Sequence, residues 1–428
     1  MSAFDKELEA VAKSHEWSNF ASLENCRFLI GKLFNALLSA EEPLRVSRFE
    51  QMSEETLLEE SEKVSRELNQ RGARALLDPS KPVEARFDQA VFILRYLETV
   101  SIETVSLPLD VNGPCCQFPD FYVIPLKDKF NKRKPEKGLL LKRRGLLFHR
   151  VIPRSFDGMA IELVPHRQLR TNFDSESRNV GASMFKYFTL MTESSDDSFC
   201  ANGAKCENQD LDAALDGQLR SALELGCDTL IWPELTLTDA QVIFLMNSLG
   251  NDHLPTSFPP IVVAGSWHSI VNGSRRNRCT VLDGRGELLF FQDKALPFFE
   301  RKEKYGKKEG IQETDIIRIL CTESELIGIF ICLDFCHEER ATLLSMLDLS
   351  LAIVPSMGGE STMRSHIQRE SSLSKRNGTK SVVVQQVLSD EAGEHGPFGY
   401  LLGRLSTKGD VAVADLAVDE QFTSFHLD

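Results

Sequence analysis

The second half of the sequence is a succession of short apolar runs, and this pattern limits the possible folds more than any other feature. From about residue 183 onward, the runs are typical of buried strands: IVVAGSW, RCTVLD, ELLFFQ, DIIRIL, LIGIFICL, LSLAIVPS and KSVVVQQV. Turn residues or helical stretches separate them, and Asp210 can cap a helix whose apolar face includes Leu211 and Leu215. The pattern predicts an α/β fold.

The first strand of this region has two candidates. Residues 158–164 (GMAIELV) and residues 185–191 (FKYFTLM) are both short and apolar. The polar stretch ESSDDSFCANGAKCENQ after the second candidate predicts a loop. We place the start of the α/β domain at residue 183 and leave the choice between the two strands open.

Residues 1–105 predict a helical N-terminal domain. Apolar side chains recur at helical spacing in SLENCRFLIGKLFNALLSA, where Cys26, Ile30 and Leu33 share one face. Gly72 is a suitable end for the next helix, and Pro82 is tolerated in the first turn of a third. These amphipathic stretches predict helices that pack on one another.

Residues 106–182 predict a partly β linker or small subdomain that prolines punctuate. This region contains a basic cluster: Lys127, Lys129, Lys132, Arg133, Lys134, Lys137, Lys142, Arg143 and Arg144. A solvated surface loop is the simpler explanation, and a docking patch for nucleic acid, phosphate or an acidic partner is the alternative.

Composition excludes several classes of protein. The chain has 428 residues, of which 42% are hydrophobic and 26% charged, as in ordinary globular proteins. Its net charge of −14 argues against general coating of nucleic acid or of an anionic membrane. The N-terminal MSAFDKELEA lacks the features of a signal peptide, and no apolar run is long enough to span a bilayer. We therefore predict a cytoplasmic protein with reduced cysteines and no membrane association.

Three reactive side chains each follow a predicted strand, where a sheet presents residues to a cleft. Glu234 ends TLIWPEL, Lys294 follows ELLFFQ, and Cys332 ends LIGIFIC. Each has an ordinary explanation when taken alone: a paired surface carboxylate, a lysine lying along apolar surface, or an inert core thiol. Their order along the chain is what favours catalysis.

Together these groups suit nucleophilic attack by a thiol. Glu234 could take the proton from Cys332, and the thiolate could then attack a carbonyl or nitrile carbon. Lys294 and the backbone N–H of Leu333 could stabilise the negative charge that develops. Glu300, six residues after Lys294, could orient the lysine or pass a proton to the leaving amine.

Other catalytic motifs are missing. HEER at 337–340 is not HExxH, and Cys332, Cys336 and His337 lack a fourth ligand at a suitable spacing for zinc. The sequence has neither a GxxxxGK[ST] loop for ATP nor a GxSxG nucleophile turn. We predict no metal and no cofactor.

The three motifs resemble those of the nitrilase, or carbon–nitrogen hydrolase, superfamily. The matching segments are WPEL at Glu234, DKALPFFE at Lys294 and Glu300, and GIFICLDFCHEER at Cys332. Supporting segments are NRCTVLDGRGELLFFQDK with Asn277, Asp283 and Gly286, then LSLAIVPSMGG, then RNGTKSVVVQQ with Asn377. The resemblance covers about residues 183–428.

This resemblance implies a four-layer α-β-β-α sandwich that assembles into homodimers or larger homo-oligomers. It implies a thioester on Cys332, which water activated by Glu234 hydrolyses. The substrate class would be a small amide or ureido compound, with a nitrile as the minority activity. Residues 1–182 have no counterpart in a minimal family member. The alternative function is therefore a binding or regulatory module, for example an effector in a prokaryotic defence system, which contacts nucleic acid through the basic cluster.

Overall fold

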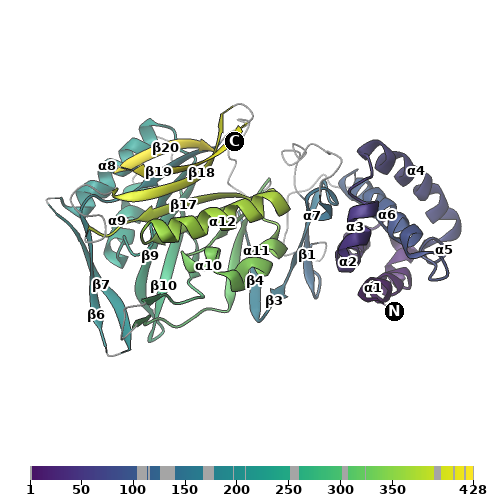
Figure 1. Ribbon diagram of the computed structural model, residues 1–428, viewed down its shortest axis with the longest axis horizontal. Helices are drawn as coiled ribbons and strands as arrows, with labels where there is room; N and C mark the ends of the chain where they lie inside the picture. The colour runs from purple at the N-terminus through teal and green to yellow at the C-terminus, as the bar shows by residue number, and fades with distance from the viewer. Residues whose placement is uncertain are drawn as a thin grey trace.

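The computed structural model describes residues 2–103, 113, 116–125, 140–166, 178–195, 197–207, 209–250, 260–300, 307–322, 324–389, 397–407, 410–418 and 421–427. Figure 1 shows an elongated molecule, with the N-terminal helices at one end and the sheets at the other. No helix of the described residues is both long and apolar enough to cross a membrane.

The N-terminal end is helical over residues 3–103, as the apolar periodicity predicts. Serine side chains cap three of the helices, because Ser2, Ser22 and Ser53 each accept a backbone N–H from the first turn. Gly72 ends the fourth helix with φ +73°, a conformation that glycine adopts freely. The elements are α1 (Ala3–Ala12), η1 (His15–Asn19), α2 (Leu23–Ser39), α3 (Glu42–Arg48), α4 (Glu54–Arg71), α5 (Ala73–Leu76) and α6 (Val83–Glu103).

Two large sheets form the framework of the rest of the described chain. In sequence labels their strand orders are β11-β10-β9-β8-β5-β20 for the six-stranded sheet and β19-β18-β17-β16-β15-β14-β4-β3 for the eight-stranded sheet. The strands of the first are β5 (Arg178–Ser183), β8 (Thr229–Trp232), β9 (Ile261–Val271), β10 (Ser274–Asp283), β11 (Leu288–Asp293) and β20 (Phe422–Leu427). Those of the second are β3 (Ser155–Phe156), β4 (Met159–Pro165), β14 (Ile316–Cys321), β15 (Leu326–Ile329), β16 (Leu351–Met357), β17 (Lys380–Gln386), β18 (Gly399–Thr407) and β19 (Asp410–Val418).

Alternating side chains show how the sheets pack. Ile327 and Ile329 point into a core that the two sheets share, whereas Leu326 and Phe330 point to the outer face of the eight-stranded sheet. That outer face is covered by α11 (Ala341–Leu347) and α12 (Glu360–Asn377), with the short α10 (Leu333–Cys336) and η3 (Glu338–Arg340) before them. Helices α8 (Leu211–Glu224) and α9 (Asp239–Leu249) cover the outer face of the six-stranded sheet.

Both candidate first strands are strands, but they belong to different sheets. Residues 158–164 correspond to β4 of the eight-stranded sheet, so the sheet region begins before residue 183. Residues 185–191 overlap β6 (Phe188–Ser194), which lies in a four-stranded sheet with β7 (Ser198–Cys206), β12 (Phe299–Glu300) and β13 (Lys307–Glu309). The prediction of a loop after residue 191 is wrong, because β7 pairs with β6. Strand β7 is partly buried, with Asn202 and Lys205 exposed.

A two-stranded ribbon lies between the N-terminal helices and the sandwich of sheets. In β1 (Phe121–Pro125), the side chain of Val123 packs into the helical core, whereas Tyr122 and Ile124 pack into the core beneath α11 and α12. The same alternation continues in its partner β2 (His149–Pro153). The region predicted as a linker or small subdomain therefore contains a ribbon whose two faces pack into two different hydrophobic cores.

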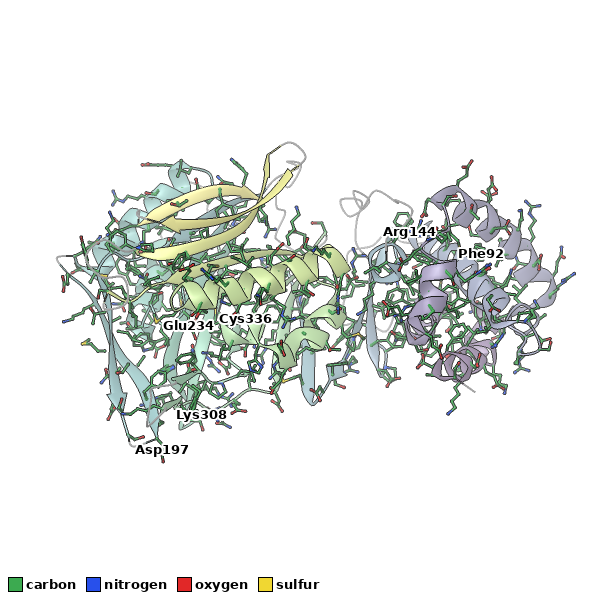
Figure 2. The ribbon with its side chains drawn as sticks, viewed as in Figure 1. Phe92, Arg144, Asp197, Glu234, Lys308 and Cys336 are labelled. Carbon is green, nitrogen blue, oxygen red and sulfur yellow. The ribbon has the colours of Figure 1, made fainter. Side chains whose placement is uncertain are left out.

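Part of the basic cluster is not at the surface. Arg144, in α7 (Leu141–Arg144), is 1% exposed, donates to the carbonyl oxygens of Phe49 and Met52, and stacks on the Phe49 ring. Figure 2 shows Arg144 beside the N-terminal helices, away from Glu234 and Cys336. Its guanidinium holds the loop after α3, so neither the solvated surface loop nor the docking patch is correct for Arg144. Lys127 to Lys137 and the side chain of Arg143 lie outside the described residues.

Candidate active site

Cys332 sits in a turn of strained backbone between β15 and α10. Its φ of +47° and ψ of −104° are unusual for a residue with a side chain, and such conformations persist where surrounding contacts impose them. Here the Cys332 N–H donates to the carbonyl oxygen of Pro355 at 2.9 Å. The turn presents the sulfur at the end of the strand, as the sequence predicts.

Glu234 follows β8 in a second strained turn, in which Leu235 has φ +54°. The neighbouring strand β9 approaches this turn closely at Gly265. A Cβ on Gly265 would lie 2.3 Å from the carbonyl oxygen of Pro233, and its φ is +58°. Glycine at this position therefore lets the strand pack against the turn that carries the carboxylate.

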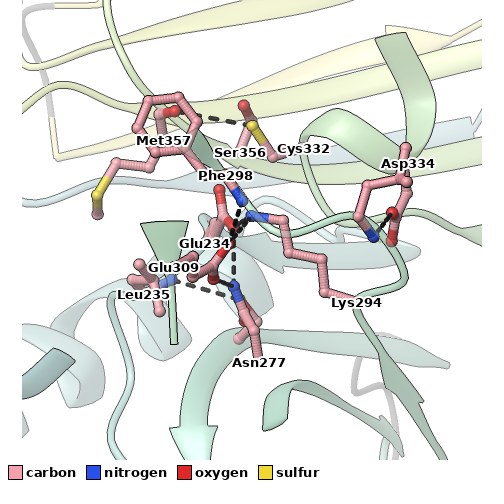
Figure 3. Close-up of polar contacts among 12 residues, drawn as sticks. Glu234, Leu235, Asn277, Lys294, Phe298, Glu309, Cys332, Asp334, Ser356 and Met357 are labelled. Atoms are coloured by element: carbon pink, nitrogen blue, oxygen red, sulfur yellow. Dashed lines mark hydrogen bonds and ion pairs between the residues drawn. The ribbon is translucent and has the colours of Figure 1, made fainter. Parts of the chain in front are cut away.

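Lys294 joins two carboxylates at the centre of the site (Figure 3). Its Nζ donates to Glu234 Oε1 at 2.7 Å and to Glu309 Oε2 at 2.8 Å. All three side chains are at most 3% exposed. Burial alone would lower the pKa of Lys294, but the two carboxylates outweigh it and raise the pKa well above its usual value. The ammonium is therefore permanently charged.

Glu309 was missed by the sequence analysis, which expected the second carboxylate at Glu300. The side chain of Glu300 lies outside the described residues, so its predicted role is not tested. Glu309 lies within the charged stretch ERKEKYGKKEGIQETD, where nothing distinguishes it from surface carboxylates. Its burial depends on the pairing of β13 with β7, a contact between residues far apart in the chain.

Four hydrogen bonds saturate the Glu309 carboxylate. Oε1 accepts from His268 Nε2 at 2.8 Å and Asn277 Nδ2 at 2.8 Å, while Oε2 accepts from Lys294 and from the Phe298 N–H at 2.7 Å. Burial would raise the pKa of Glu309, but Lys294 and His268 lower it overall. Glu309 is therefore held as an anion with no free acceptor position.

Asn277 ties the two carboxylates together. Its Nδ2 donates to Glu309 and, at 2.9 Å, to Glu234 Oε1. Both partners are acceptors, so the amide nitrogen must face them. The Asn277 backbone carbonyl oxygen also accepts the backbone N–H of Lys294 at 2.8 Å. One residue of β10 thus fixes the lysine and both acids.

The Cys332 sulfur lies beside this cluster and donates to the Met357 carbonyl oxygen at 3.8 Å. Burial and the negative charge of Glu234 raise the pKa of the thiol well above its usual value, although Lys294 acts in the opposite direction. The resting thiol is therefore protonated and needs a base. Glu234 Oε2 accepts no hydrogen bond from the described residues, whereas Oε1 accepts from Asn277 and Lys294.

Asp334 connects the cysteine turn to the lysine segment. Its carboxylate accepts the N–H of Ala295 at 3.0 Å and that of Leu296 at 2.8 Å, which directly follow Lys294. Burial raises the pKa of Asp334 to about 7, against the lowering effect of these hydrogen bonds. Leu333, the first residue of α10, donates its N–H to no described group, so this donor is available to a ligand.

The described residues contain no cluster of three or more histidines, cysteines or acidic residues that could hold a metal ion. The arrangement offers instead the chemistry of its own side chains. A protonated thiol, an adjacent carboxylate with a free oxygen, a fixed ammonium and an unused backbone N–H together suit acyl transfer through a thioester.

Comparison with solved structures returns hydrolases of this chemical class. One is an amidase from Nesterenkonia sp., with TM-score 0.40 and 16% identity, covering 58% of this chain and 90% of that chain. Another is a carbon–nitrogen hydrolase from Helicobacter pylori G27, with TM-score 0.41 and 13% identity, covering 59% and 89%. A third is a mutant of the Nesterenkonia sp. AN1 amidase, with TM-score 0.41 and 16% identity, covering 58% and 90%. It shows covalent addition of the acetamide moiety of fluoroacetamide at its active-site cysteine.

No protein-family model matches the chain, and no curated protein matches its sequence. The solved structures belong to the class that the sequence motifs resemble, amidases and carbon–nitrogen hydrolases. Their sequence identities to this chain are 13–16% and their TM-scores 0.40–0.41.

Proposed function

We propose that this chain is a cysteine hydrolase of the nitrilase superfamily that cleaves a non-peptide carbon–nitrogen bond. The observation that carries the proposal is the Lys294 ammonium, which bridges Glu234 and Glu309 beside the Cys332 thiol. Two sheets with helices on their outer faces are consistent with the four-layer sandwich of that superfamily. The assembly of such sandwiches into homo-oligomers is part of the same proposal.

The first half-reaction forms a thioester. Glu234 takes the proton from Cys332, and the thiolate attacks the carbonyl carbon of the substrate. The Lys294 ammonium and the Leu333 N–H stabilise the oxyanion of the tetrahedral intermediate. When the intermediate collapses, the C–N bond breaks and Glu234 returns the proton to the leaving nitrogen, which departs as ammonia or an amine.

The second half-reaction consumes water. Glu234 is again a carboxylate once the amine has left, and it takes a proton from a water molecule that attacks the thioester carbon. The C–S bond then breaks, the carboxylic acid leaves, and the proton returns to the Cys332 sulfur. Glu309 exchanges no proton in this scheme, because its two oxygens are already occupied by four donors.

The burial of the site favours small substrates. Cys332 and Glu234 are each 3% exposed, and apolar Leu235 and Trp267 pack together near them. A linear amide or ureido compound with a short acyl group fits such a site better than a peptide chain does. A nitrile is the alternative substrate class.

The test is a comparison of Cys332→Ala with the wild-type chain on a panel of short amides. The wild type should release ammonia and show a mass increase equal to the acyl group on Cys332. The variant should do neither. Cys336→Ala, which removes a thiol four residues away, is the matched control and should retain both signals. Ammonia release by Cys332→Ala at the wild-type rate would refute the proposal.

A further inference from the structure

One buried histidine in the site has no part in the proton transfers proposed above. His268, on β9, is 5% exposed and has a hydrogen-bond partner on each ring nitrogen. Nδ1 accepts the backbone N–H of Ala201 at 2.8 Å, and Nε2 lies 2.8 Å from Glu309 Oε1. The ring therefore connects β7 to the carboxylate that holds Lys294.

These contacts fix which nitrogen carries the proton. The Ala201 N–H can only donate, so Nδ1 must present its lone pair. Nε2 then carries the hydrogen and donates it to Glu309. A doubly protonated ring would break the bond to Ala201, so the geometry favours the neutral imidazole in one tautomer.

The consequence for Lys294 follows from the hydrogen bonds of Glu309. His268 and Asn277 occupy Oε1, which turns Oε2 toward Lys294 and the Phe298 N–H. Without the histidine donor, a buried carboxylate would lose one of its four hydrogen bonds and bind a proton more readily. A protonated Glu309 would hold the ammonium less firmly, and the lysine could move from the place where the oxyanion forms.

We propose that His268 is a positioning residue for catalysis. It keeps Glu309 ionised and oriented, so that Glu309 holds the Lys294 ammonium where the oxyanion of the transition state forms. Because His268 also bonds to Ala201, the position of Lys294 depends on β7. The kinetic part of this inference depends on the proposed hydrolase function.

Two variants separate the contacts of the ring. In His268→Asn, the side-chain oxygen can still accept from Ala201, but the shorter side chain does not reach Glu309. In His268→Gln, the amide nitrogen can replace Nε2 as the donor to Glu309. Ser269→Ala is the control, because Ser269 lies next on the same strand and bonds instead to Asp239.

We expect His268→Asn to lower kcat about tenfold to a hundredfold, the value of one hydrogen bond to a charged group, with little change in KM. The low-pH limb of kcat/KM should move to higher pH, because Glu309 must remain ionised. His268→Gln should restore most of kcat and the wild-type limb, and Ser269→Ala should match the wild type. The inference would be overturned if the two His268 variants lowered kcat equally. It would also be overturned if His268→Asn lowered kcat without moving the low-pH limb of kcat/KM.

A measurement without substrate keeps this test separate from the proposed function. Unfolding by denaturant should show His268→Asn less stable than His268→Gln at pH 7, and the difference should shrink below about pH 4.5 as Glu309 is protonated. If the wild type cleaves no amide, the hydrolase proposal fails and this difference still tests the contact. If the wild type is active but the two variants unfold alike at all pH values, the positioning role fails alone.

Discussion

At the scale of single residues, the site is built on unequal roles for two carboxylates. Glu309 is saturated by four donors, whereas Glu234 shares only one oxygen with Lys294 and Asn277. A saturated, ionised acid is a poor proton carrier, and an acid with a free oxygen next to a thiol is a good one. This difference in hydrogen bonding supports the proposal that Glu234, and not Glu309, is the base.

Replacing Lys294 with Met tests the electrostatic part of this arrangement. Lys294→Met should abolish amide hydrolysis and lower the free energy of unfolding at pH 7 by about 3–5 kcal/mol, because it leaves two carboxylates buried without their cation. The measurement is denaturant unfolding across pH, with ammonia release for activity.

The pH dependence of that loss has a definite sign. In the wild type the pKa of Glu309 is lowered on folding, so its stabilising contribution is present above its unfolded pKa and is lost as pH falls through the folded pKa. The variant lacks this contribution, so its deficit should be largest at neutral pH and shrink in acid. A deficit that stays constant from pH 7 down to about pH 2 would contradict the ion-pair explanation.

The sequence could predict only those site residues that directly follow a recognisable strand. Cys332, Glu234 and Lys294 follow apolar runs that mark strand ends, so their meeting could be expected from the pattern. His268 lies within an apolar strand, where a core histidine satisfied by its neighbours is the ordinary expectation. Glu309 is hidden in a charged stretch. Both reach the site through the pairing of β13 with β7 and the packing of β7 against β9, which no local pattern encodes.

At the scale of elements, helix α2 packs closely against strand β1 because α2 has a glycine at the point of contact. On α2, Gly31 faces the ring of Phe121 on β1, and a Cβ on Gly31 would lie 2.1 Å from the nearest ring carbon. A Cβ on Gly217 of α8 would meet no described atom within 4 Å, so the two glycines differ chiefly in their surroundings. Comparing substitutions at the two glycines therefore separates the effect of helix propensity on stability from the effect of packing.

Replacing each of these glycines with Ala should give opposite results. Ala favours a helix over Gly by about 1 kcal/mol, so Gly217→Ala should raise the melting temperature. Gly31→Ala gains the same propensity, but the clash with Phe121 should outweigh it and destabilise the chain by about 1–3 kcal/mol net. Thermal unfolding of the two variants checks this. Equal stabilisation by both would mean that the ribbon can move away from α2 without cost.

Amphipathic periodicity predicted the N-terminal helices well because each shows an apolar face to one core. Between residues 106 and 182 the sequence predicted only a partly β linker or small subdomain. The ribbon of β1 and β2 is short and lies between two cores, so it buries both faces and shows no alternation of polar and apolar residues. The prediction of a loop at β7 was wrong for a different reason. A partly exposed hairpin strand has a polar composition, and its sequence therefore looks like that of a loop.

At the scale of the whole molecule, the N-terminal helices are joined to the two large sheets and their helices by buried polar contacts as well as by the ribbon. Arg150 on β2 pairs with Asp348, which follows α11, with 3.1 Å between Nε and Oδ2. Lys142 on α7 donates to the carbonyl oxygen of Ser345 at 3.0 Å. These contacts cross from residues outside the family resemblance to residues inside it.

Asp348→Asn should weaken this junction without adding bulk. Asp348 has φ +45°, a conformation that Asn also tolerates, so the change removes charge and little else. Arg150 is 1% exposed, and losing this charged hydrogen bond should cost about 1.5–3 kcal/mol. Hydrogen exchange followed by mass spectrometry should show faster exchange in β1, β2 and the N-terminal helices, while β16 and β17 stay protected.

The same variant tests whether the N-terminal region affects the proposed activity. If the N-terminal helices do not affect the active site, Asp348→Asn should speed hydrogen exchange at the junction while the acylation rate of Cys332 stays at the wild-type value. The packing favours a different result, because α11 covers the eight-stranded sheet, whose strand β15 leads to Cys332, and also contacts β2 of the ribbon. Loosening the ribbon should therefore slow acylation severalfold, and unchanged acylation with an opened junction would show that the two ends of the molecule act independently.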